Sequence, residues 1–425
     1  MRLEAGSVAL FAGEGAGRRA LLIERAGGSV LEGTLAFPGG RLEEGEDAEA
    51  GALRELREET GLVLPRERLE PAGDFLMEGY VPAPLRLRVF TAHLAEAEAA
   101  EPVAGDDAAT AGWRPVGELL AGWAEGRLPL SDSVRAILEA REAGEVAAGA
   151  LELRRGVQLL ALPAPTLPPA THTNCYLLGT GEERILVDPG ADDPADARPL
   201  LEALDALAAA GIRLREVWLT HHHRDHHAAL PYLRARQTIR CRAHPLTARA
   251  LPGGVVDATL RDEEVVELPG PIPQRWRVVA TPGHTGDHLS FFEEARGSLL
   301  CGDHLAGVGT VIIDPPDGDL KAYLESLDRL EGLGADLLLP AHGPPSTLVG
   351  ERIRMYRAHR LAREAAILAA MEAGAREIPA IVAAVYTDVP TYLHVFAERS
   401  VLAHLLKLEV EKRVLREGER WEPIG

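Results

Sequence analysis

Short apolar runs, each soon followed by a histidine or an aspartate, recur along the middle of this chain of 425 residues. Residues 217–219 (Val-Trp-Leu) form a run of the kind that a buried strand needs, and a histidine-rich segment follows directly. Four further runs have the same form: residues 185–187, 278–280, 299–302 and 337–341. Open α/β sheets place their sites at the carboxyl ends of strands, so we expect these polar residues to meet at one sheet edge.

The first third of the chain predicts a hairpin followed by a loop and a helix. Residues 7–11 and 19–24 alternate or run apolar on either side of the Gly-rich residues 13–17, as in a β-hairpin. Residues 46–59 carry apolar positions at helical spacing and stop at Gly61, which predicts one helix. Closing helices are expected at residues 119–126 and 133–143, and a linker rich in Ala, Gly and Glu at residues 141–149.

The end of the chain predicts three helices and a short hairpin. The helices are expected at residues 351–374, 378–386 and 392–414, and the hairpin at residues 414–421. Three helices followed by a two-stranded wing are the elements of a winged-helix module. A basic stripe, partly continuous and without an acid inside it, is predicted on the first of these helices by Arg354, Arg357, Arg360 and Arg363.

The charge of the chain limits its partners. The formal net charge is −20, which disfavours a surface that coats nucleic acid in general. Only residues 351–425, with 12 basic and 11 acidic residues, are not acidic overall. Three cysteines without close spacing predict no disulfide framework, and no signal peptide or membrane-spanning run is expected. We therefore expect a cytoplasmic protein without a membrane partner, and the oligomeric state stays open.

The densest candidate chemistry lies at residues 220–227, which read Thr-His-His-His-Arg-Asp-His-His. His221, His223, Asp225 and His226 supply imidazoles and one carboxylate, which are ligands that suit Zn²⁺ and also Mn or Fe. One cluster cannot fill two metal spheres, and further candidates precede or follow it: Asp188, His284, Asp303 and His342. The other histidines of this region are expected to be exposed or to act only behind the ligands: His172, His222, His227, His244, His288 and His304.

In their order along the chain, these candidates resemble the motifs of the metallo-β-lactamase superfamily over about residues 157–345. The resemblance implies an αβ/βα sandwich with two metal ions, Zn or else Mn or Fe. It assigns His221, His223 and His284 to one metal, Asp225, His226 and His342 to the other, and Asp303 to both as a bridge. The metals would share a hydroxide of lowered pKa, which Asp225 would orient, while Asp188 would fix loop or imidazole geometry from behind the ligands.

A second acidic cluster lies on the helix predicted in the first third of the chain. Glu55, Glu58 and Glu59 stand at positions i, i+3 and i+4, so their carboxylates project from one face and would repel one another without a cation. Mg²⁺ suits such hard oxygen ligands and bridges to substrate phosphates. The spacing from Gly40 through Glu46 to residues 54–62 (Arg-Glu-Leu-Arg-Glu-Glu-Thr-Gly-Leu) resembles the Nudix box without a break.

The Nudix resemblance implies an α/β/α sandwich over residues 1–150 that hydrolyses a nucleoside diphosphate linked to another group. The three glutamates would bind Mg (or Mn), Glu58 or Glu59 would help to activate water, and Arg54 would orient a carboxylate. Asp106 and Asp107 are the candidates for further acidic ligands from a later loop. Phe-Pro-Gly-Gly at residues 37–40 is similar to a motif of Nudix enzymes that act on coenzyme A. The longer coenzyme A signature of those enzymes is not recognisable here, so the identity of the small nucleotide-containing substrate stays open.

The second and third parts together resemble the β-lactamase-like endoribonuclease branch, with a winged-helix tail at residues 350–425. Pro-x-Pro-Thr-Leu at residues 163–167 and stretches at residues 363–368 and 400–405 support this resemblance. Pro-Ala-His-Gly at residues 340–343 departs from it, because that branch more usually has Gly before the His. The implied reaction is dinuclear-metal hydrolysis of RNA phosphodiesters, with single-stranded RNA as a candidate partner of the arginine stripe.

Two alternatives use the same motifs. A glyoxalase-II-like or acyl-CoA thioester hydrolase would use the same metal set, and its Nudix part would trim the same coenzyme or nucleotide. A nucleotide-sensing regulator would bind nucleic acid through the winged helix, but intact catalytic motifs and the overall acidity count against it. The expected fold class in each case is an α/β multidomain protein, and the two catalytic sites are expected to work independently.

Overall fold

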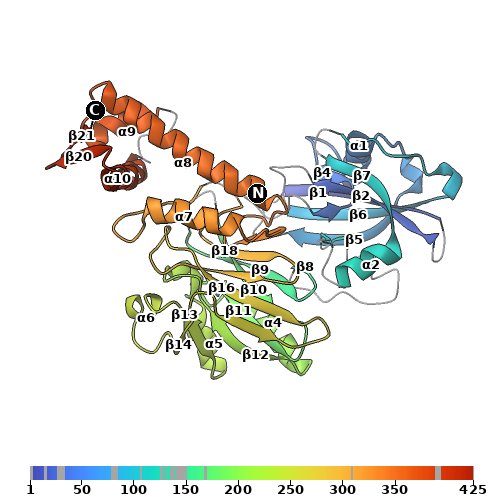
Figure 1. The fold of residues 1–425 in the computed structure, drawn as a ribbon. Helices are drawn as coiled ribbons and strands as arrows, with labels where there is room; N and C mark the ends of the chain where they lie inside the picture. Colours follow the sequence, from blue (N-terminus) through green and yellow to red (C-terminus); the bar gives the residue numbers. More distant parts are fainter. Residues whose placement is uncertain are drawn as a thin grey trace.

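The computed structural model shows a chain of three successive parts (Figure 1). It describes residues 3–424 except 14–16, 26–33, 78–84, 106–107, 125–127, 129, 132, 135–137, 139–150, 167–169, 308–309 and 388–393. Several expected features lie outside the described residues: Asp106 and Asp107, the linker at residues 141–149, most of the helix expected at residues 133–143, and Leu167. No helix in the described part of the chain combines the length and apolar character that crossing a bilayer requires.

One seven-stranded sheet forms the first part. Its strands are β1 (Leu3–Ala12), β2 (Arg19–Arg25), β3 (Leu35–Ala36), β4 (Gly39–Arg41), β5 (Glu70–Met77), β6 (Leu85–Leu94) and β7 (Ala108–Pro115). The order is β3-β2-β1-β6-β5, with β4 paired to β1 and β7 paired to β2. β1 is antiparallel to β2, as the predicted hairpin requires, and parallel to β6.

Helices cover both faces of this sheet. They are α1 (Ala48–Thr60) and α2 (Val116–Ala124). Val8 and Leu10 of β1 belong to the core under α1, whereas Ala9 and Phe11 belong to the core under α2, because successive strand residues point to opposite faces. The expected α/β/α sandwich is therefore present.

The ends of α1 are set by its capping residues. Asp47 accepts a hydrogen bond from Ala50 N at 2.9 Å, so the helix begins at Ala48 rather than at the expected residue 46. Gly61 ends the helix at φ 71°, a left-handed conformation that favours glycine. The predicted stop at Gly61 is confirmed.

Two sheets form the second part. The first contains, in order, β14 (Ala258–Thr259), β13 (Arg240–Ala243), β12 (Arg213–Trp218), β11 (Glu183–Val187), β10 (His172–Leu178), β9 (Val157–Pro163) and β8 (Leu151–Arg154). The second contains β15 (Val265–Leu268), β16 (Gln274–Ala280), β17 (Leu289–Glu293), β18 (Ser298–Gly302) and β19 (Leu337–Pro340). Every apolar run that was expected to be a strand is one.

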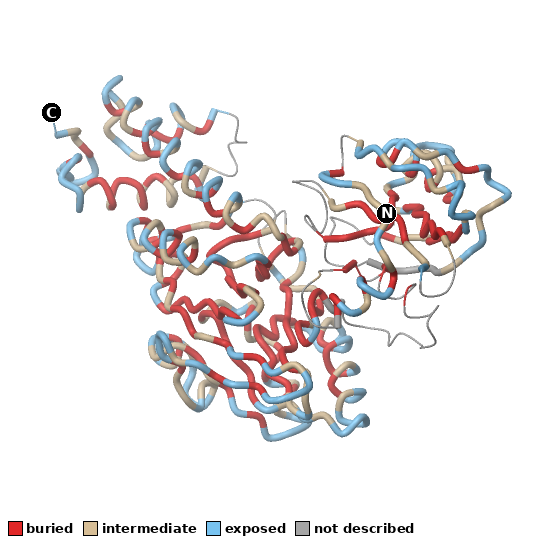
Figure 2. The backbone as a smooth tube through the Cα atoms, turned by 45° about the vertical axis from the view of Figure 1, so that its right-hand side comes forward, coloured by how far each residue is buried: buried red, intermediate tan, exposed pale blue. Residues whose placement is uncertain are grey.

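The two sheets pack face to face with helices outside, in the expected αβ/βα order. Trp218 of β12 and Phe291 of β17 lie in the shared core with ring centroids 4.8 Å apart. The first sheet is covered by α4 (Arg198–Ala209) and α5 (Leu230–Arg236), and the second by α7 (Leu320–Glu331) and the start of α8 (Val349–Glu372). Buried residues follow the strands of both sheets in Figure 2.

The expectation that the polar residues meet at one sheet edge is wrong. β11 and β12 belong to the first sheet, whereas β16, β18 and β19 belong to the second. A single run of apolar residues does not specify which sheet a strand joins, because both sheets bury their inner faces in the same core. The polar residues therefore meet where the ends of two packed sheets coincide.

The tail has the expected three helices and hairpin. They are α8, α9 (Ile378–Val385), α10 (His394–Val410), β20 (Val414–Glu417) and β21 (Arg420–Pro423). Ile367 of α8, Ile381 of α9, Leu405 of α10 and Trp421 of the hairpin share a core. The first half of α8 instead packs with the second sheet through Ile353. Because one helix contributes to both cores, the domain boundary expected at residue 350 stays a prediction.

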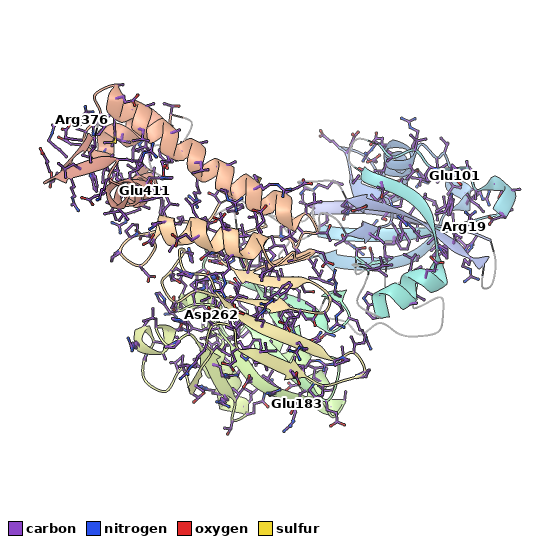
Figure 3. The ribbon with its side chains drawn as sticks, in the orientation of Figure 1. Arg19, Glu101, Glu183, Asp262, Arg376 and Glu411 are labelled. Atoms are coloured by element: carbon purple, nitrogen blue, oxygen red, sulfur yellow. The ribbon has the colours of Figure 1, made fainter. Side chains whose placement is uncertain are left out.

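A buried ion cluster joins α8 to α10. Glu364 accepts hydrogen bonds from Lys407 Nζ at 2.8 Å and Arg413 Nη1 at 3.0 Å, and His404 lies 3.9 Å away. Lys407 also pairs with Glu411, which is labelled in Figure 3. The side chains of Glu364 and Lys407 are each 7 % exposed. Burial alone would raise the pKa of Glu364, but the nearby imidazole of His404 and the hydrogen-bonded ammonium group of Lys407 lower it to about 2.

We expect Glu364→Gln to lower the free energy of unfolding by about 1–3 kcal/mol at pH 7, because Lys407 and Arg413 lose a shared buried carboxylate and Lys407 keeps only Glu411 as a charge partner. The pKa of Glu364 is about 2 in the folded chain and about 4.3 when unfolded. Its contribution is therefore present above pH ~4.3 and is lost as the pH falls towards 2. In thermal unfolding, the difference in melting temperature between wild type and variant should be smaller at pH 3 than at pH 7.

Glu372→Gln, at an exposed position of the same helix, is the control for this comparison. A melting temperature of Glu364→Gln equal to that of wild type at pH 7 would contradict the role of the cluster.

Candidate metal centre

Four loops, each following a strand, bring the predicted ligands together. β12 leads into residues 220–227, which include the short turn η4 (Arg224–His226). β16 leads to His284, β18 to Asp303 and β19 to His342. All seven predicted ligands fall into two groups of converging ligand atoms.

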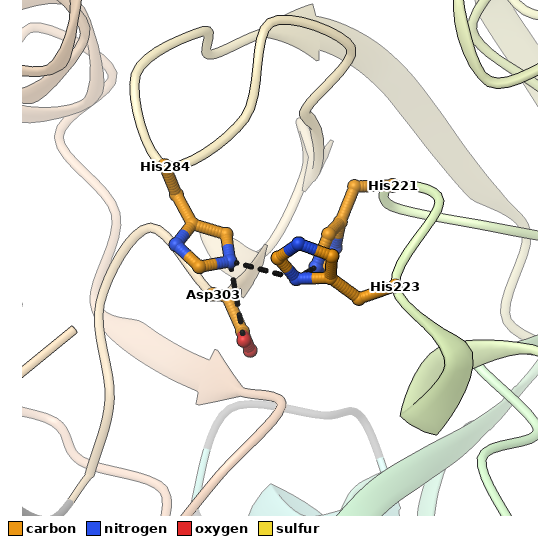
Figure 4. A group of neighbouring side chains, drawn as sticks. All are labelled: His221, His223, His284 and Asp303. Carbon is orange, nitrogen blue, oxygen red and sulfur yellow. Dashed lines mark hydrogen bonds and ion pairs between the residues drawn. The ribbon is translucent and has the colours of Figure 1, made fainter. Parts of the chain in front are cut away.

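The first group contains His221, His223, His284 and Asp303, whose ligand atoms all lie within 4.8 Å of one another (Figure 4). His223 Nδ1 lies 2.9 Å from His221 Nε2 and 3.1 Å from His284 Nε2. Asp303 Oδ2 lies 3.6 Å from His284 Nε2. Three imidazole nitrogens and one carboxylate oxygen at such distances can surround one cation.

The second group contains Asp225, His226 and His342, again within 4.8 Å. Asp303 lies between the groups, because its Oδ1 is 3.5 Å from His226 Nε2 and 3.2 Å from His342 Nε2 while its Oδ2 faces His284. One carboxylate thus offers an oxygen to each group. This is the position that a bridging ligand requires.

The outer nitrogens of two ligands are held by backbone carbonyl groups. His284 Nδ1 lies 2.7 Å from the carbonyl oxygen of Ile312, and His342 Nδ1 lies 2.9 Å from that of His172. A carbonyl oxygen only accepts, so Nδ1 carries the proton and Nε2 of the neutral ring presents its lone pair to the site. Sequence reasoning missed these two carbonyl groups, because backbone acceptors have no side-chain signal.

Asp188 lies behind the ligands, where the prediction placed it. Its carboxylate accepts from Thr220 N at 2.8 Å and Thr220 Oγ1 at 2.7 Å, and it lies 2.9 Å from His226 Nδ1. Asp188 is 2 % exposed and has φ 51°, a strained conformation for a residue other than glycine. At Gly190 a Cβ atom would lie 1.8 Å from the carbonyl oxygen of Asp225. Both residues therefore fix the loop that presents Asp225 and His226.

The surroundings lower the pKa of some imidazoles of the site and raise the pKa of others. Burial, helped by neighbouring imidazoles, lowers the pKa of His223 to about 4. Burial would also lower the pKa of His342, but Asp303 and Asp225 raise it to about 10. Burial alone would raise the pKa of Asp225, whereas His226 and His342 lower it to about 2. A bound cation would displace the proton that His342 holds next to Asp303 and Asp225, because a histidine that binds a metal carries no proton on the ligand nitrogen.

Buried polar atoms without a hydrogen bond mark the centre of the site. His226 Nε2, His342 Nε2 and Asp303 Oδ1 have no such partner among the described residues. A buried polar atom left unsatisfied costs about 1–3 kcal/mol, so three that face one another need a common partner. A divalent cation fits these nitrogen and carboxylate donors, and the same donor set suits Zn, Mn and Fe.

Most of the remaining histidines stay outside the ligand groups formed by the described residues, as expected: His172, His227, His244, His288 and His304. His288 is buried and accepts at Nε2 from the backbone N of Asp303 at 3.1 Å, so it supports a ligand loop. His222 differs, because it forms a third group with His223 and Asp317. Its Nδ1 lies 3.1 Å from Asp287.

A pocket of about 380 Å³ opens onto both ligand groups. His223, Asp225, His284, Asp303 and His342 line it on the side of the metal centre. The other described lining residues are largely apolar or paired in charge: Pro165, Thr166, Ala170, Ala306, Thr310, Val311, Ile312, Asp314, Asp317, Phe396 and Arg399. A substrate that reaches the metal centre therefore contacts an apolar wall.

The carboxylates of α1 have partners within the chain, and the metal site expected at Glu55, Glu58 and Glu59 stays a prediction. Arg54 Nη1 donates to Glu55 and to Glu58, each at 2.9 Å. Glu59 is 4 % exposed and accepts from Gly39 N at 2.8 Å. Within the described part of the chain these three carboxylates form no metal-binding group. The oxygen donors suit Mg²⁺, but a guanidinium group holds two of them.

Arg54 also contacts groups outside the helix, and its role in orienting a carboxylate during catalysis stays a prediction. Its Nε and Nη2 each donate to Glu46 at 3.1 Å, and Nη2 also donates to the carbonyl oxygen of Arg41 at 2.8 Å. Burial raises the pKa of Glu55, although Arg54 opposes this effect. At Gly40 a Cβ atom would lie 2.2 Å from Glu55 Oε1, so a larger residue there would displace the Glu55 carboxylate.

Protein families match the three parts in turn. Residues 1–133 match the NUDIX domain, residues 168–342 the metallo-beta-lactamase superfamily, and residues 378–421 the beta-lactamase associated winged helix domain. The lactamase-like protein vrtG of Penicillium aethiopicum is 31 % identical over 278 residues, which cover 62 % of this chain and 85 % of that protein. The chain belongs to the metallo-beta-lactamase superfamily.

With its NUDIX and metallo-beta-lactamase domains, the protein is a metal-dependent hydrolase. Another relative is the atrochrysone carboxyl ACP thioesterase of Aspergillus fumigatus, 31 % identical over 207 residues, which cover 48 % of this chain and 61 % of that protein. A beta-lactamase domain protein from Burkholderia ambifaria has a similar solved structure, with a TM-score of 0.54 and 26 % identity. That likeness covers 67 % of this chain and 98 % of the other.

We expect the metallo-beta-lactamase domain to bind about two transition-metal ions per chain. His226→Gln should lower this ratio to about one, because the second group loses an imidazole ligand while the first stays complete. His227→Gln is the matched control, since His227 belongs to no ligand group among the described residues. Elemental analysis after reconstitution with Zn, Mn or Fe measures the ratio. Equal metal in wild type and His226→Gln, or none in wild type, would refute the assignment.

Proposed function

We propose that the metallo-beta-lactamase domain hydrolyses the thioester bond of an acyl group carried on a thiol. The observation that supports this is the pocket at the metal centre, which apolar Val311, Ile312 and Phe396 line together with the ligand residues. Among the described lining residues Arg399 is the one Lys or Arg, and it is paired with Asp314. A pocket of this kind suits an uncharged acyl group better than a polyanionic strand.

The residues of the site have defined tasks in this reaction. When bound, two divalent cations would supply an activated water and polarise the carbonyl oxygen of the thioester. Asp225 is ionised, with a pKa of about 2, and lines the pocket, so it can accept a hydrogen bond from the water and orient it. Addition of the water oxygen to the carbonyl carbon would break the carbon–sulfur bond, with one proton of the water passing to the sulfur of the leaving thiol and the other remaining with the carboxylic acid.

The relative from Aspergillus fumigatus adds support for this substrate class. Its name is that of a thioesterase that acts on a carboxyl group held by an acyl carrier protein. The metal motifs in the sequence are also compatible with thioester hydrolysis. Coenzyme A and acyl carrier proteins present acyl groups through the same type of thiol, so either is a carrier of the proposed substrate.

Hydrolysis of RNA phosphodiesters is the alternative from the endoribonuclease resemblance. That proposal assigns phosphate contacts to the arginine stripe of α8, but each arginine of the stripe has a partner within the chain. Arg354 and Arg357 pair with Glu331, Arg357 also pairs with Asp328, Arg360 donates to the carbonyl oxygen of Val311, and Arg363 lies 4.0 Å from the centre of the Tyr386 ring. These contacts favour a role in helix packing over a role in binding RNA.

For the NUDIX domain we propose Mg²⁺-dependent hydrolysis of a nucleoside diphosphate derivative. The match over residues 1–133 and the unbroken box of residues 40–62 support it. Coenzyme A contains a nucleoside diphosphate, so the thiol product of one domain is a candidate substrate of the other. The presence of two hydrolase domains favours catalysis over a purely regulatory role.

A direct comparison of thioesters with RNA tests the first proposal. The reconstituted full chain should release thiol from acyl-CoA, followed with a thiol-reactive chromogen, and should leave single-stranded RNA intact. The three cysteines of the protein are buried and 0 % exposed, so they add little signal. His226→Gln should lose most of the thiol release and His227→Gln should keep it. Cleavage of RNA without release of thiol would overturn the proposal.

The two active sites should work independently. Glu58→Gln removes a carboxylate of the Nudix box, so Mg²⁺-dependent cleavage of coenzyme A or of ADP-linked sugars, measured by chromatography of the nucleotide product, should fall to background. Release of thiol from acyl-CoA should stay near wild type. Glu44→Gln, at an exposed position outside the helix, is the control. Loss of both activities in a folded Glu58→Gln protein would point to a shared substrate channel.

A further inference from the structure

The tail contributes directly to the pocket of the metallo-beta-lactamase domain. Phe396 and Arg399 stand three residues apart on α10 and therefore share one face of the helix. Both line the pocket that His223, His284 and Asp303 line. The tail thus reaches the substrate side of the metal centre, although no residue of the tail is a predicted ligand.

The tail also holds a loop of this pocket, residues 310–317. Arginines of the tail donate to three residues of the loop: Arg360 to Val311, and Arg399 to Asp314 and Pro315. Between these contacts, the carbonyl oxygen of Ile312 fixes the ligand His284 at 2.7 Å. The wall of the pocket and the orientation of one ligand are therefore both tied to the tail.

We infer that Phe396 determines which acyl groups the enzyme accepts, because the acyl chain packs against its ring. This inference rests on the proposed thioesterase function. Phe396 is 41 % exposed, although it shares the pocket with Val311, which is 8 % exposed, and with Ile312. An aromatic side chain in that position leaves water only when an apolar group enters the pocket, and this burial favours binding.

The charges of the pocket and its size limit the substrate further. Arg399 is bound to Asp314, so the positive group beside Phe396 is neutralised and does not attract an anionic chain. A volume of about 380 Å³ lies near the lower end of the range for small-molecule pockets. The acyl group is therefore an uncharged chain of short to medium length.

The test is a series of straight-chain acyl-CoA substrates from acetyl to octanoyl, with the metal-reconstituted full chain. In wild type, kcat/KM should rise with chain length by up to about fourfold for each buried methylene group. Phe396→Ala should flatten this rise, mainly through KM, so that the ratio of octanoyl to acetyl activity falls by about 10-fold or more. Phe396→Leu, which keeps an apolar side chain, should restore part of the rise.

Val395→Ala is the matched control, since Val395 is a 58 % exposed apolar neighbour that does not line the pocket. Its profile should follow wild type. If kcat/KM rises with chain length equally in wild type and Phe396→Ala, the inference is overturned while the proposed function stands. Loss of bound metal in Phe396→Ala would also overturn the inference, because it would mean that Phe396 has a structural role. A wild-type enzyme that releases no thiol from any of these substrates would overturn the proposed function, and the inference with it.

Discussion

A buried carboxylate surrounded by imidazoles is the constraint on which the second part of the molecule depends. Asp303 is 9 % exposed and lies within 3.6 Å of the Nε2 atoms of His226, His284 and His342. Charges removed from water to this extent need close partners, so loops from two sheets have to arrive at one point. The shared core fixes where the sheet ends lie, and Asp188 fixes the loop that presents His226. Without a cation, the members of this cluster repel one another or are kept away from water. The sandwich is the rigid frame that holds them together.

The ligands could be predicted from the sequence because each follows a short apolar run, which is a local signal of a strand end. All five runs are strands, and the seven ligands converge in two groups. The sheet to which each strand belongs could not be predicted, since inner-face residues of both sheets are equally apolar. The carbonyl groups of Ile312 and His172 were also beyond prediction, because they approach His284 and His342 only through the tertiary fold.

The NUDIX helix shows a different limit of prediction from spacing. Positions i, i+3 and i+4 do place Glu55, Glu58 and Glu59 on one face of the helix, and the cap at Asp47 and the stop at Gly61 follow from local chemistry. Helical spacing does not specify rotamers, however. Arg54 lies beside the same carboxylates and neutralises two of them, while the amide of Gly39 draws Glu59 into the core. The repulsion from which a cation was predicted is therefore partly relieved within the chain itself.

The arginines of α8 show why a periodic charge pattern in the sequence does not by itself specify a binding surface. A repeat of three residues falls short of a full turn, so successive arginines turn by about 60° and four of them sweep about 180° around the helix. Arg354 consequently remains at the surface near α7, whereas Arg360 is 6 % exposed and holds the loop of the metallohydrolase pocket. Arg363 continues the turn and reaches Tyr386 after α9. Through these contacts α8 is linked to the metallo-beta-lactamase domain at one end and to the core of the tail at the other. This arrangement places α10, and with it Phe396, at the pocket of the metal centre.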